Sequence, residues 1–322
     1  MLRPCQAQTR IVLRQAPLTK PSQCLLSTAT KPEPHPRAGD IGRSIKDEYA
    51  LIRDNYQTPK YPIVLAHGLL GFDELRLLGP AFPGIQYWRG IKQALHANGI
   101  EVITAAVGPT DSIERRGEAL AEYISHHANG KSVNIIAHSM GGLDSRYMIS
   151  RLKPANVDVK SLTTIATPHR GSSFADYVFE KIGKERLPRV FQAMERMSLP
   201  TGAYSQLTRK YMAEEFNPKT PDREGVRYFS YGASCQPMWW SSFWHSEWVI
   251  RRAEGPNDGL VSVESAQWGD YKGTLVDVSH LDLINWTNRL RWMLWELTGN
   301  RRQFNAVAFY LSIADMLAKE GF

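Results

Sequence analysis

A serine stands between small residues where an apolar run gives way to a helical pattern. The segment from Val133 reads Val-Asn-Ile-Ile-Ala-His-Ser-Met-Gly-Gly, so Ser139 lies two residues after Ala137 and two before Gly141. A serine on so sharp a strand-to-helix turn projects its hydroxyl from the sheet edge, and its neighbours at −2 and +2 must be small. The spacing predicts that Ser139 is a nucleophile. The alternative is that Ser139 only caps the helix that follows.

A glycine-containing loop precedes this serine in the chain. It reads His67-Gly-Leu-Leu-Gly71 and directly follows the apolar run 61–66. Attack on a carbonyl needs two backbone N–H donors for the oxyanion, one after the nucleophile and one from such an early loop. We expect these donors to be Met140 and Leu69, because Gly68 lets the chain turn without a Cβ clash. An ordinary glycine turn is the alternative.

Chain order selects the acid and the base. In a strand-turn-helix site of this kind the nucleophile comes first, then the acid, then the histidine. Asp258 lies in the turn Pro256-Asn-Asp-Gly-Leu-Val261, and His280 is the only histidine after it. His280 also stands two residues past the apolar run 274–278, where a last strand would deliver it to the carboxyl edge of the sheet.

The other histidines near these motifs fit the base position less well. His138 and His169 lie beside the predicted nucleophile but before the acid, and His245 also precedes Asp258. We expect His245 to be structural or membrane-facing. His280 would take the Ser139 proton and return it to a leaving alcohol, while Asp258 holds the imidazole tautomer. This mechanism uses protein groups alone, so no cofactor is expected.

Short apolar runs alternate with amphipathic stretches through most of the chain. This alternation is typical of a parallel sheet with crossover helices. Together with the serine turn it predicts an α/β-hydrolase fold over residues 41–322, with a mostly parallel sheet of about six strands, flanking helices and a helical cap. The expected strands are 61–66, 101–106, 133–137, 162–166, 226–232 and 274–278, and the expected helices include 87–97, 112–127 and 141–152.

The alternation lapses between about residues 171 and 223. Helix-like pieces with four prolines fill this stretch, which is too long for a plain connection and is therefore a candidate cap or lid. Leu187, Val190, Phe191, Met194 and Met197 would form one apolar helical face that could cover the site in water.

The charge is unevenly distributed. The formal net charge is +7, yet residues 1–32 hold five basic side chains and no acidic one, which leaves 34 basic and 32 acidic side chains elsewhere. The nearly neutral body argues against nucleic-acid binding. A basic, acid-free start followed by a Pro-rich linker predicts a mitochondrial-type presequence over residues 1–40 and hence a mitochondrial protein; a disordered basic tail is the alternative.

Cysteine usage and hydropathy limit which disulfides and which kinds of membrane contact are possible. Cys5 and Cys24 fall in the predicted presequence, which leaves Cys235 alone and excludes an internal disulfide in the body. No run of 18 apolar residues occurs in the sequence, so membrane contact would be peripheral. Four tryptophans lie within 238–248, a composition that suits a lipid interface, an acyl pocket or core packing.

Taken together, these blocks resemble the triacylglycerol lipases of the Pseudomonas and Burkholderia type and, with the leader, most closely the fungal mitochondrial triacylglycerol lipases related to them. The matching blocks begin at Tyr61, Tyr87, Ala137, Thr167, Asn257 and His280. The resemblance implies a lipid ester substrate, a triad of Ser139, Asp258 and His280, and an oxyanion hole of Leu69 and Met140. A phospholipase, thioesterase or acyltransferase with the same triad remains open, as does a catalytically silent lipid-binding protein.

The resemblance also raises a structural calcium ion. Asp282 matches one ligand position of the bacterial enzymes, yet no aspartate lies between Ser234 and Asn257, where the second carboxylate is expected. We therefore expect no metal site. Asp282 is expected to cap the helix that follows it.

Overall fold

A computed structural model of the chain describes residues 41–69, 74–75, 85–182, 202–237, 241, 243–286 and 304–322. The predicted presequence, 1–40, lies outside the described residues, as does the segment 183–201 that contains the predicted apolar lid face. Among the described helices, none combines the length and the apolar character needed to cross a membrane.

A seven-stranded parallel sheet forms the centre of the described fold. Its strand order is β1-β9-β8-β7-β6-β2-β5, and every neighbouring pair is parallel. The strands are β1 (Ser44–Ile45), β2 (Ile63–Ala66), β5 (Val102–Ala105), β6 (Val133–His138), β7 (Val159–Ile165), β8 (Arg227–Ser234) and β9 (Asp270–Val276). A separate antiparallel pair joins β3 (Glu74–Leu75) to β4 (Ile85–Gln86).

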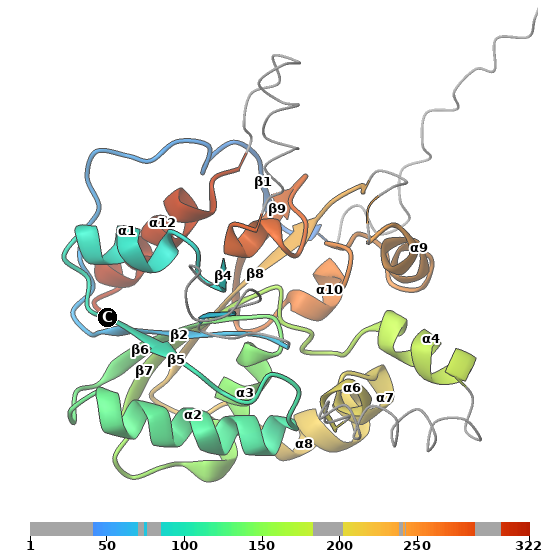
Figure 1. Cartoon of the computed structure of the whole chain (residues 1–322), viewed down its shortest axis with the longest axis horizontal. Coiled ribbons are helices and arrows are strands. Elements are labelled where there is room, and N and C mark those ends of the chain that lie inside the picture. Colours follow the sequence, from blue (N-terminus) through green and yellow to red (C-terminus); the bar gives the residue numbers. More distant parts are fainter. Residues whose placement is uncertain are drawn as a thin grey trace, which may run out of the picture. The chain divides into compact units, whose positions relative to one another are not determined.

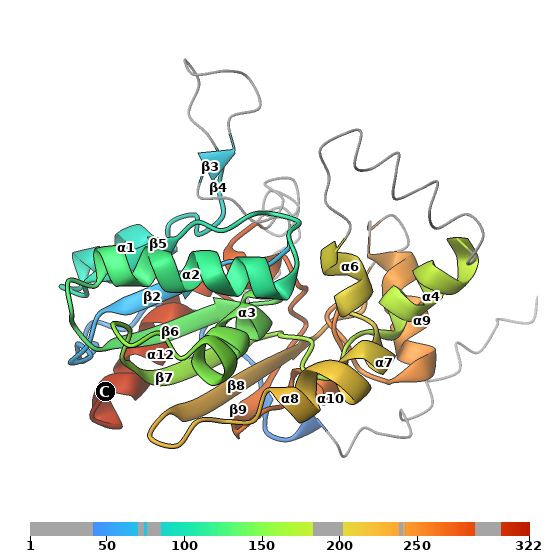
Figure 2. The ribbon, with the colours of Figure 1, turned by 90° about the horizontal axis from the view of Figure 1, so that it is seen from below.

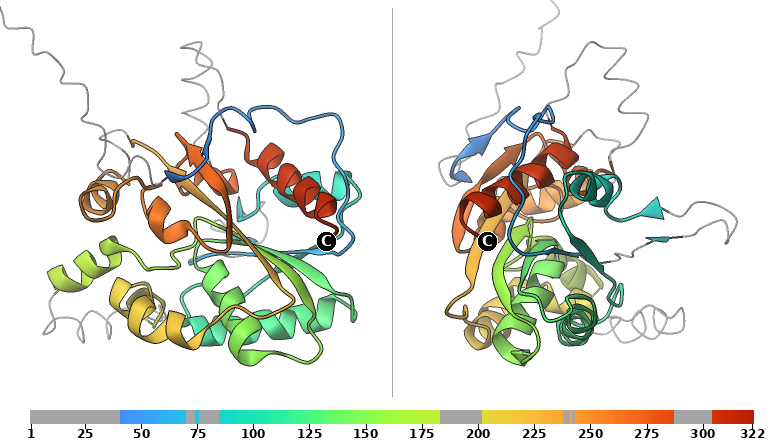
Figure 3. Two further views of the ribbon diagram at one scale, coloured as in Figure 1. Left: turned by 180° about the vertical axis from the view of Figure 1, so that it is seen from behind. Right: turned by 90° about the vertical axis from the view of Figure 1, so that its left-hand side faces the viewer.

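The central strands are buried on both faces, because helices cover the sheet from either side (Figures 1 and 3). All residues of β2, β5 and β6 are buried, which explains why they read as continuous apolar runs. Helices α1 (Ile91–Ala97) and α12 (Ala306–Lys319) pack together on one face. Helix α2 (Ile113–His127) and α3 (Gly141–Tyr147), which continues as the π-helical turn η2 (Met148–Leu152), cover the other.

The predicted α/β-hydrolase sheet is confirmed, with differences at its margins. The structure adds β1, a two-residue edge strand too short to show a hydrophobic period, and β9 begins at Asp270 rather than at Thr274. The predicted helix 141–152 is interrupted by η2 at its end. The C-terminal helix α12 has a packed rather than a free face, because Phe309, Tyr310 and Ile313 are fully buried.

Short helices replace the strand alternation between β7 and β8. They are α4 (Ser173–Ile182), α6 (Gly202–Gln206), α7 (Arg209–Tyr211), the π-helical turn η3 (Met212–Phe216) and α8 (Asn217–Lys219). Figure 2 shows them gathered at one end of the sheet with α9 (Trp244–Ala253), and α4 packs directly against α9. The sequence therefore correctly indicates helical pieces between these two strands.

Candidate active site

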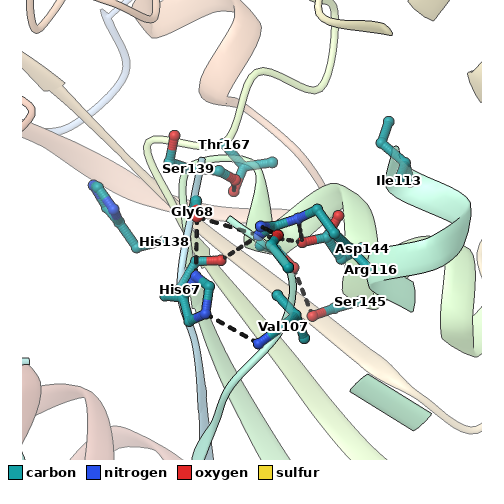
Figure 4. Close-up of polar contacts among 12 residues, drawn as sticks. His67, Gly68, Val107, Ile113, Arg116, His138, Ser139, Asp144, Ser145 and Thr167 are labelled. Carbon is teal, nitrogen blue, oxygen red and sulfur yellow. Dashed lines mark hydrogen bonds and ion pairs between the residues drawn. The ribbon is translucent and has the colours of Figure 1, made fainter. Parts of the chain in front are cut away.

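Ser139 lies on a strained turn between β6 and α3. Its φ angle is 56°, in the left-handed region that is costly for a residue with a Cβ. The backbone on both sides holds this conformation: the Ser139 N–H donates to the Ile165 carbonyl at 2.9 Å, and the Thr167 hydroxyl donates to the Ser139 carbonyl at 2.7 Å. Figure 4 shows Ser139 and Thr167 side by side.

Small neighbours are a steric requirement of this turn. A Cβ on Gly141 would lie 2.6 Å from the Ala66 carbonyl oxygen, so α3 could not begin so close to β2 with any larger residue. The −2 position, Ala137, is fully buried in β6. The predicted requirement for small residues on both sides of Ser139 agrees with this geometry.

Asp258 and His280 form a buried hydrogen-bonded pair. The distance between Asp258 Oδ2 and His280 Nδ1 is 2.7 Å, and the two residues are 0% and 4% exposed. The other carboxylate oxygen, Oδ1, accepts from the N–H groups of Leu260 and Val261, while the His280 N–H donates to the Asp258 carbonyl at 2.9 Å. Because the carboxylate accepts a hydrogen bond from Nδ1–H, the proton of the neutral His280 ring is on Nδ1. The lone pair therefore remains on Nε2, as a general base requires.

The structure brings His280 to the predicted nucleophile turn. Its ring lies with its centroid 4.5 Å from the ring of His138, the residue immediately before Ser139. No hydrogen bond joins Ser139 to His280 among the described residues, and catalytic hydrogen bonds often tighten only when substrate binds. Ser139 follows β6, and His280 lies four residues after the end of β9, at the same carboxyl edge of the sheet.

The early glycine loop lies against this turn. The Gly68 carbonyl accepts from Arg116 Nη2 at 3.2 Å, and His67 Nδ1 lies 3.0 Å from the same oxygen. Val107 donates its N–H to His67 Nε2, so the ring proton is on Nδ1 and points at Gly68. In a trans peptide the N–H points opposite to the C=O, so these two donors fix the direction of the Leu69 N–H.

A buried ion pair supports that loop from beneath (Figure 4). Arg116 is 0% exposed and donates through Nε to Asp144 Oδ2 at 2.9 Å, and it also reaches the carbonyl of His67 at 2.8 Å. Burial raises the pKa of Asp144 to about 6, against the opposing effect of Arg116. Burial, followed by the charge of Arg116, lowers the pKa of His67 to about 4, which keeps this ring neutral at ordinary pH.

Arg116 is not among the residues predicted from the motifs, although the sequence carries a signal for it. Its position continues the buried stripe of α2, which consists of Ile113, Arg116, Gly117, Leu120 and Ile124. A guanidinium at a stripe position points into the core and needs internal acceptors.

Met140, the other predicted oxyanion donor, is buried at the start of α3, where N–H groups lack intrahelical acceptors.

The Asp282 carboxylate stabilises a turn in this structure. Its Oδ2 accepts from the N–H of Ser279 at 3.0 Å and from the Ser279 hydroxyl at 2.7 Å, and the short 3-10 helix η4 (Asp282–Ile284) begins there. Within the described ranges, no three His, Cys, Asp or Glu side chains are grouped so that they could hold a metal ion.

The Trp-rich segment is partly outside the protein interior. Trp244 and Trp248 are 47% and 43% exposed on α9, so core packing does not describe them. The ring of His245 lies between aromatic neighbours, 5.4 Å from Tyr177 and 6.4 Å from Trp248. His245 is therefore a surface aromatic contact in this structure.

The parallel sheet, the strained serine turn and the Asp–His pair define an α/β-hydrolase. The solved structure of Staphylococcus hyicus lipase has the same fold, with a TM-score of 0.59 at 19% identity over 83% of this chain and 98% of that one. A model of the PGAP1-like alpha/beta domain matches residues 111–197.

Curated relatives identify the family. Triacylglycerol lipase 2 of Saccharomyces cerevisiae is 40% identical over 317 residues, covering 84% of this chain and 95% of the yeast protein. A triacylglycerol lipase of Burkholderia plantarii is 39% identical over 150 residues, covering 44% of this chain and 39% of that protein. The chain belongs to the triacylglycerol lipase family of carboxylic ester hydrolases, and the resemblance seen in its sequence is confirmed.

Proposed function

We propose that this chain is a triacylglycerol lipase in which Ser139, His280 and Asp258 form the catalytic triad. The observation that carries the proposal is the 2.7 Å hydrogen bond between Asp258 and His280, whose ring lies against the residue preceding the strained Ser139. Family membership supports a lipid ester as substrate.

The reaction would proceed in two halves. His280 Nε2 takes the Ser139 proton as the serine oxygen bonds to the ester carbonyl carbon, and the carbonyl oxygen becomes an oxyanion held by the N–H groups of Leu69 and Met140. Collapse of this intermediate breaks the ester C–O bond, and His280 returns the proton to the departing alcohol. Water then attacks the acyl-serine by the same path and releases the fatty acid.

A fluorophosphonate probe tests the nucleophile whatever the substrate is. The wild-type protein should label and hydrolyse short-chain nitrophenyl esters, whereas Ser139→Ala should lose both with its fold intact. The matched control is Ser132→Ala, because Ser132 precedes the same strand and its hydroxyl donates to Asp158 at the surface. Labelling that persisted in the Ser139 variant would place the nucleophile elsewhere, and an unlabelled wild type would favour a silent lipid-binding protein.

The same triad could serve other acyl donors, so a substrate comparison is needed. Purified protein should release fatty acid from an emulsified triglyceride faster than from phosphatidylcholine vesicles or from an acyl thioester. Preference for either of the latter would change the assignment to a phospholipase or a thioesterase.

We further propose a mitochondrial location and a peripheral contact with lipid. The basic, acid-free composition of residues 1–32 supports import, and the exposed tryptophans of α9 support the lipid contact. Residues 1–40 fused to a fluorescent protein should direct it to mitochondria; a cytosolic signal would reject the presequence. Residues 171–223 are proposed as the cap of the 41–322 hydrolase domain.

A further inference from the structure

One hydroxyl joins the oxyanion loop to the residue before the nucleophile. The Tyr87 hydroxyl accepts from the Gly68 N–H at 3.0 Å and lies 2.7 Å from His138 Nδ1. Because the amide can only donate, the phenolic oxygen accepts from Gly68 and its own proton is free to go to His138. Both side chains are buried, with Tyr87 6% and His138 1% exposed.

These bonds determine the tautomer of His138. Burial, followed by the proximity of His280, holds the pKa of His138 well below its usual value, so the ring is neutral. A neutral ring that accepts at Nδ1 carries its proton on Nε2. That nitrogen is buried, no group lies within hydrogen-bonding geometry of it among the described residues, and the polar group that favours a proton there is the His280 backbone.

The remaining side of His138 faces the candidate base. The two ring centroids are 4.5 Å apart with an interplanar angle of 45°, and the His280 backbone is near enough to favour a proton on the His138 ring. His138 therefore contacts Tyr87 through one edge and the base loop through the other. A neutral ring in this place does not oppose the positive charge that His280 gains during turnover, whereas a charged ring would.

We infer that Tyr87 and His138 are positioning residues that hold the oxyanion loop and the base loop at a fixed separation around Ser139. The inference rests on the proposed triad and goes beyond it, because neither residue reacts. Arg116 and His67 fix the carbonyl of Gly68, while Tyr87 fixes its N–H, so that both peptide planes at Gly68 are held. Loss of the Tyr87 hydroxyl removes one of the two hydrogen bonds on the 67–68 peptide, whose carbonyl still accepts from Arg116, and it also removes the donor to the His138 ring.

Tyr87→Phe is the direct test, since it removes one oxygen and keeps the packing. With a soluble nitrophenyl ester we expect kcat to fall about 10- to 100-fold with KM changed little, because small displacements of donor and base affect mainly the transition state. Loss of the donor also lets the His138 ring take up a proton more readily, so the dependence of kcat on pH below neutrality should differ from that of the wild type.

The control is Tyr310→Phe, a substitution of the same kind in the same core. Tyr310 is fully buried, packs on Trp88, and its hydroxyl has no hydrogen-bond partner. This variant should keep wild-type kcat and pH profile. Equal kcat values for the two variants, or a Tyr87→Phe effect confined to KM, would overturn the inference.

His138 variants separate the two contacts and guard against a folding artefact. In His138→Asn the amide oxygen can still accept from Tyr87, whereas His138→Leu removes both contacts, so the first should recover part of the kcat that the second loses at matched thermal stability. Equal kcat in both would contradict the role of the Tyr87 bond. Fluorophosphonate labelling of the wild-type protein tests the triad separately. If the triad assignment is wrong, the wild-type protein will not label. If only the positioning role is wrong, the wild-type protein will label and the variants will behave alike.

Discussion

Gly68 and Ser139 approach each other so closely that a Cβ on Gly68 would lie 2.7 Å from the Cβ of the serine. The backbone of the early loop therefore lies directly beside the nucleophile, and a side chain there must displace one or the other. Gly68→Ala should lower kcat about 100-fold, the effect of losing one oxyanion donor. The measurement is turnover of a soluble ester by the folded variant.

Gly130→Ala is the comparison for that substitution. A Cβ there meets open space, although its φ of 74° makes any side chain strained. This variant should lose some stability and no activity. If Gly68→Ala kept more than a third of wild-type kcat, the close approach would have no catalytic meaning.

The second prediction separates the candidate base from a rival histidine. His280→Ala should reduce soluble-ester turnover by several orders of magnitude, because the serine loses its proton acceptor. His245→Ala should leave turnover within a few-fold, since its ring contacts Tyr177 and Trp248 at the surface. The reverse ranking in purified, folded variants would show that chain order selected the wrong residue.

The third prediction concerns acid stability. Burial lowers the pKa of His67 to about 4 and holds those of His138 and His169 well below their usual value. The unfolded chain binds protons at these rings below about pH 6.5 while the folded chain does not, so stability is complete above that pH and is lost as the pH falls. Each ring contributes up to about 1.4 kcal/mol per pH unit.

Asp144 acts in the opposite sense, because its raised pKa lets the folded state take up one proton below about pH 6. Three histidines outweigh one carboxyl group, so the free energy of unfolding should still fall between pH 6.5 and 5. Urea denaturation at several pH values measures the slope. His169→Gln should reduce that slope, whereas the exposed His126→Gln should not; a flat profile would mean that these rings are charged in the folded protein.

The serine turn can be predicted from the sequence because its constraints are local. A strained serine turn needs small neighbours, and a buried parallel strand needs a continuous apolar run; both leave traces within ten residues. Chain order then places Asp258 and His280, and the structure brings them within hydrogen-bonding distance.

The supports of the site are harder to predict because they are contacts between distant segments. Arg116 acts on the loop at His67, and the Tyr87 hydroxyl joins Gly68 to His138, 51 residues away from the tyrosine. No local sequence pattern predicts which distant group such a side chain will hydrogen-bond. Edge strand β1 is missed for a similar reason, since its two residues are defined only by pairing with β9.

The last prediction concerns the outer face of α9. Trp244, Trp248 and Arg252 recur every four residues and so share one side of the helix, opposite the buried Ile250. The Arg252 guanidinium lies 4.2 Å from the centre of the Trp248 ring, which places a cation beside exposed aromatic surface. Amphipathic rings of this kind favour the boundary between lipid and water, and a cation beside them favours anionic headgroups.

Trp244→Ser combined with Trp248→Ser should therefore weaken activity on an emulsified glyceride about tenfold or more, since each ring can bury apolar area worth roughly 1–2 kcal/mol at a lipid surface. Turnover of a soluble ester should stay within twofold, because both rings are exposed on the surface of α9. Leu51→Ser with Ile52→Ser is the control, as these residues are also exposed, at 81% and 53%, but lie before the first long strand and away from α9 in the chain. Vesicle co-sedimentation measures the contact itself. Equal losses on emulsion and soluble ester, or equal binding by both double variants, would show that α9 faces water during catalysis.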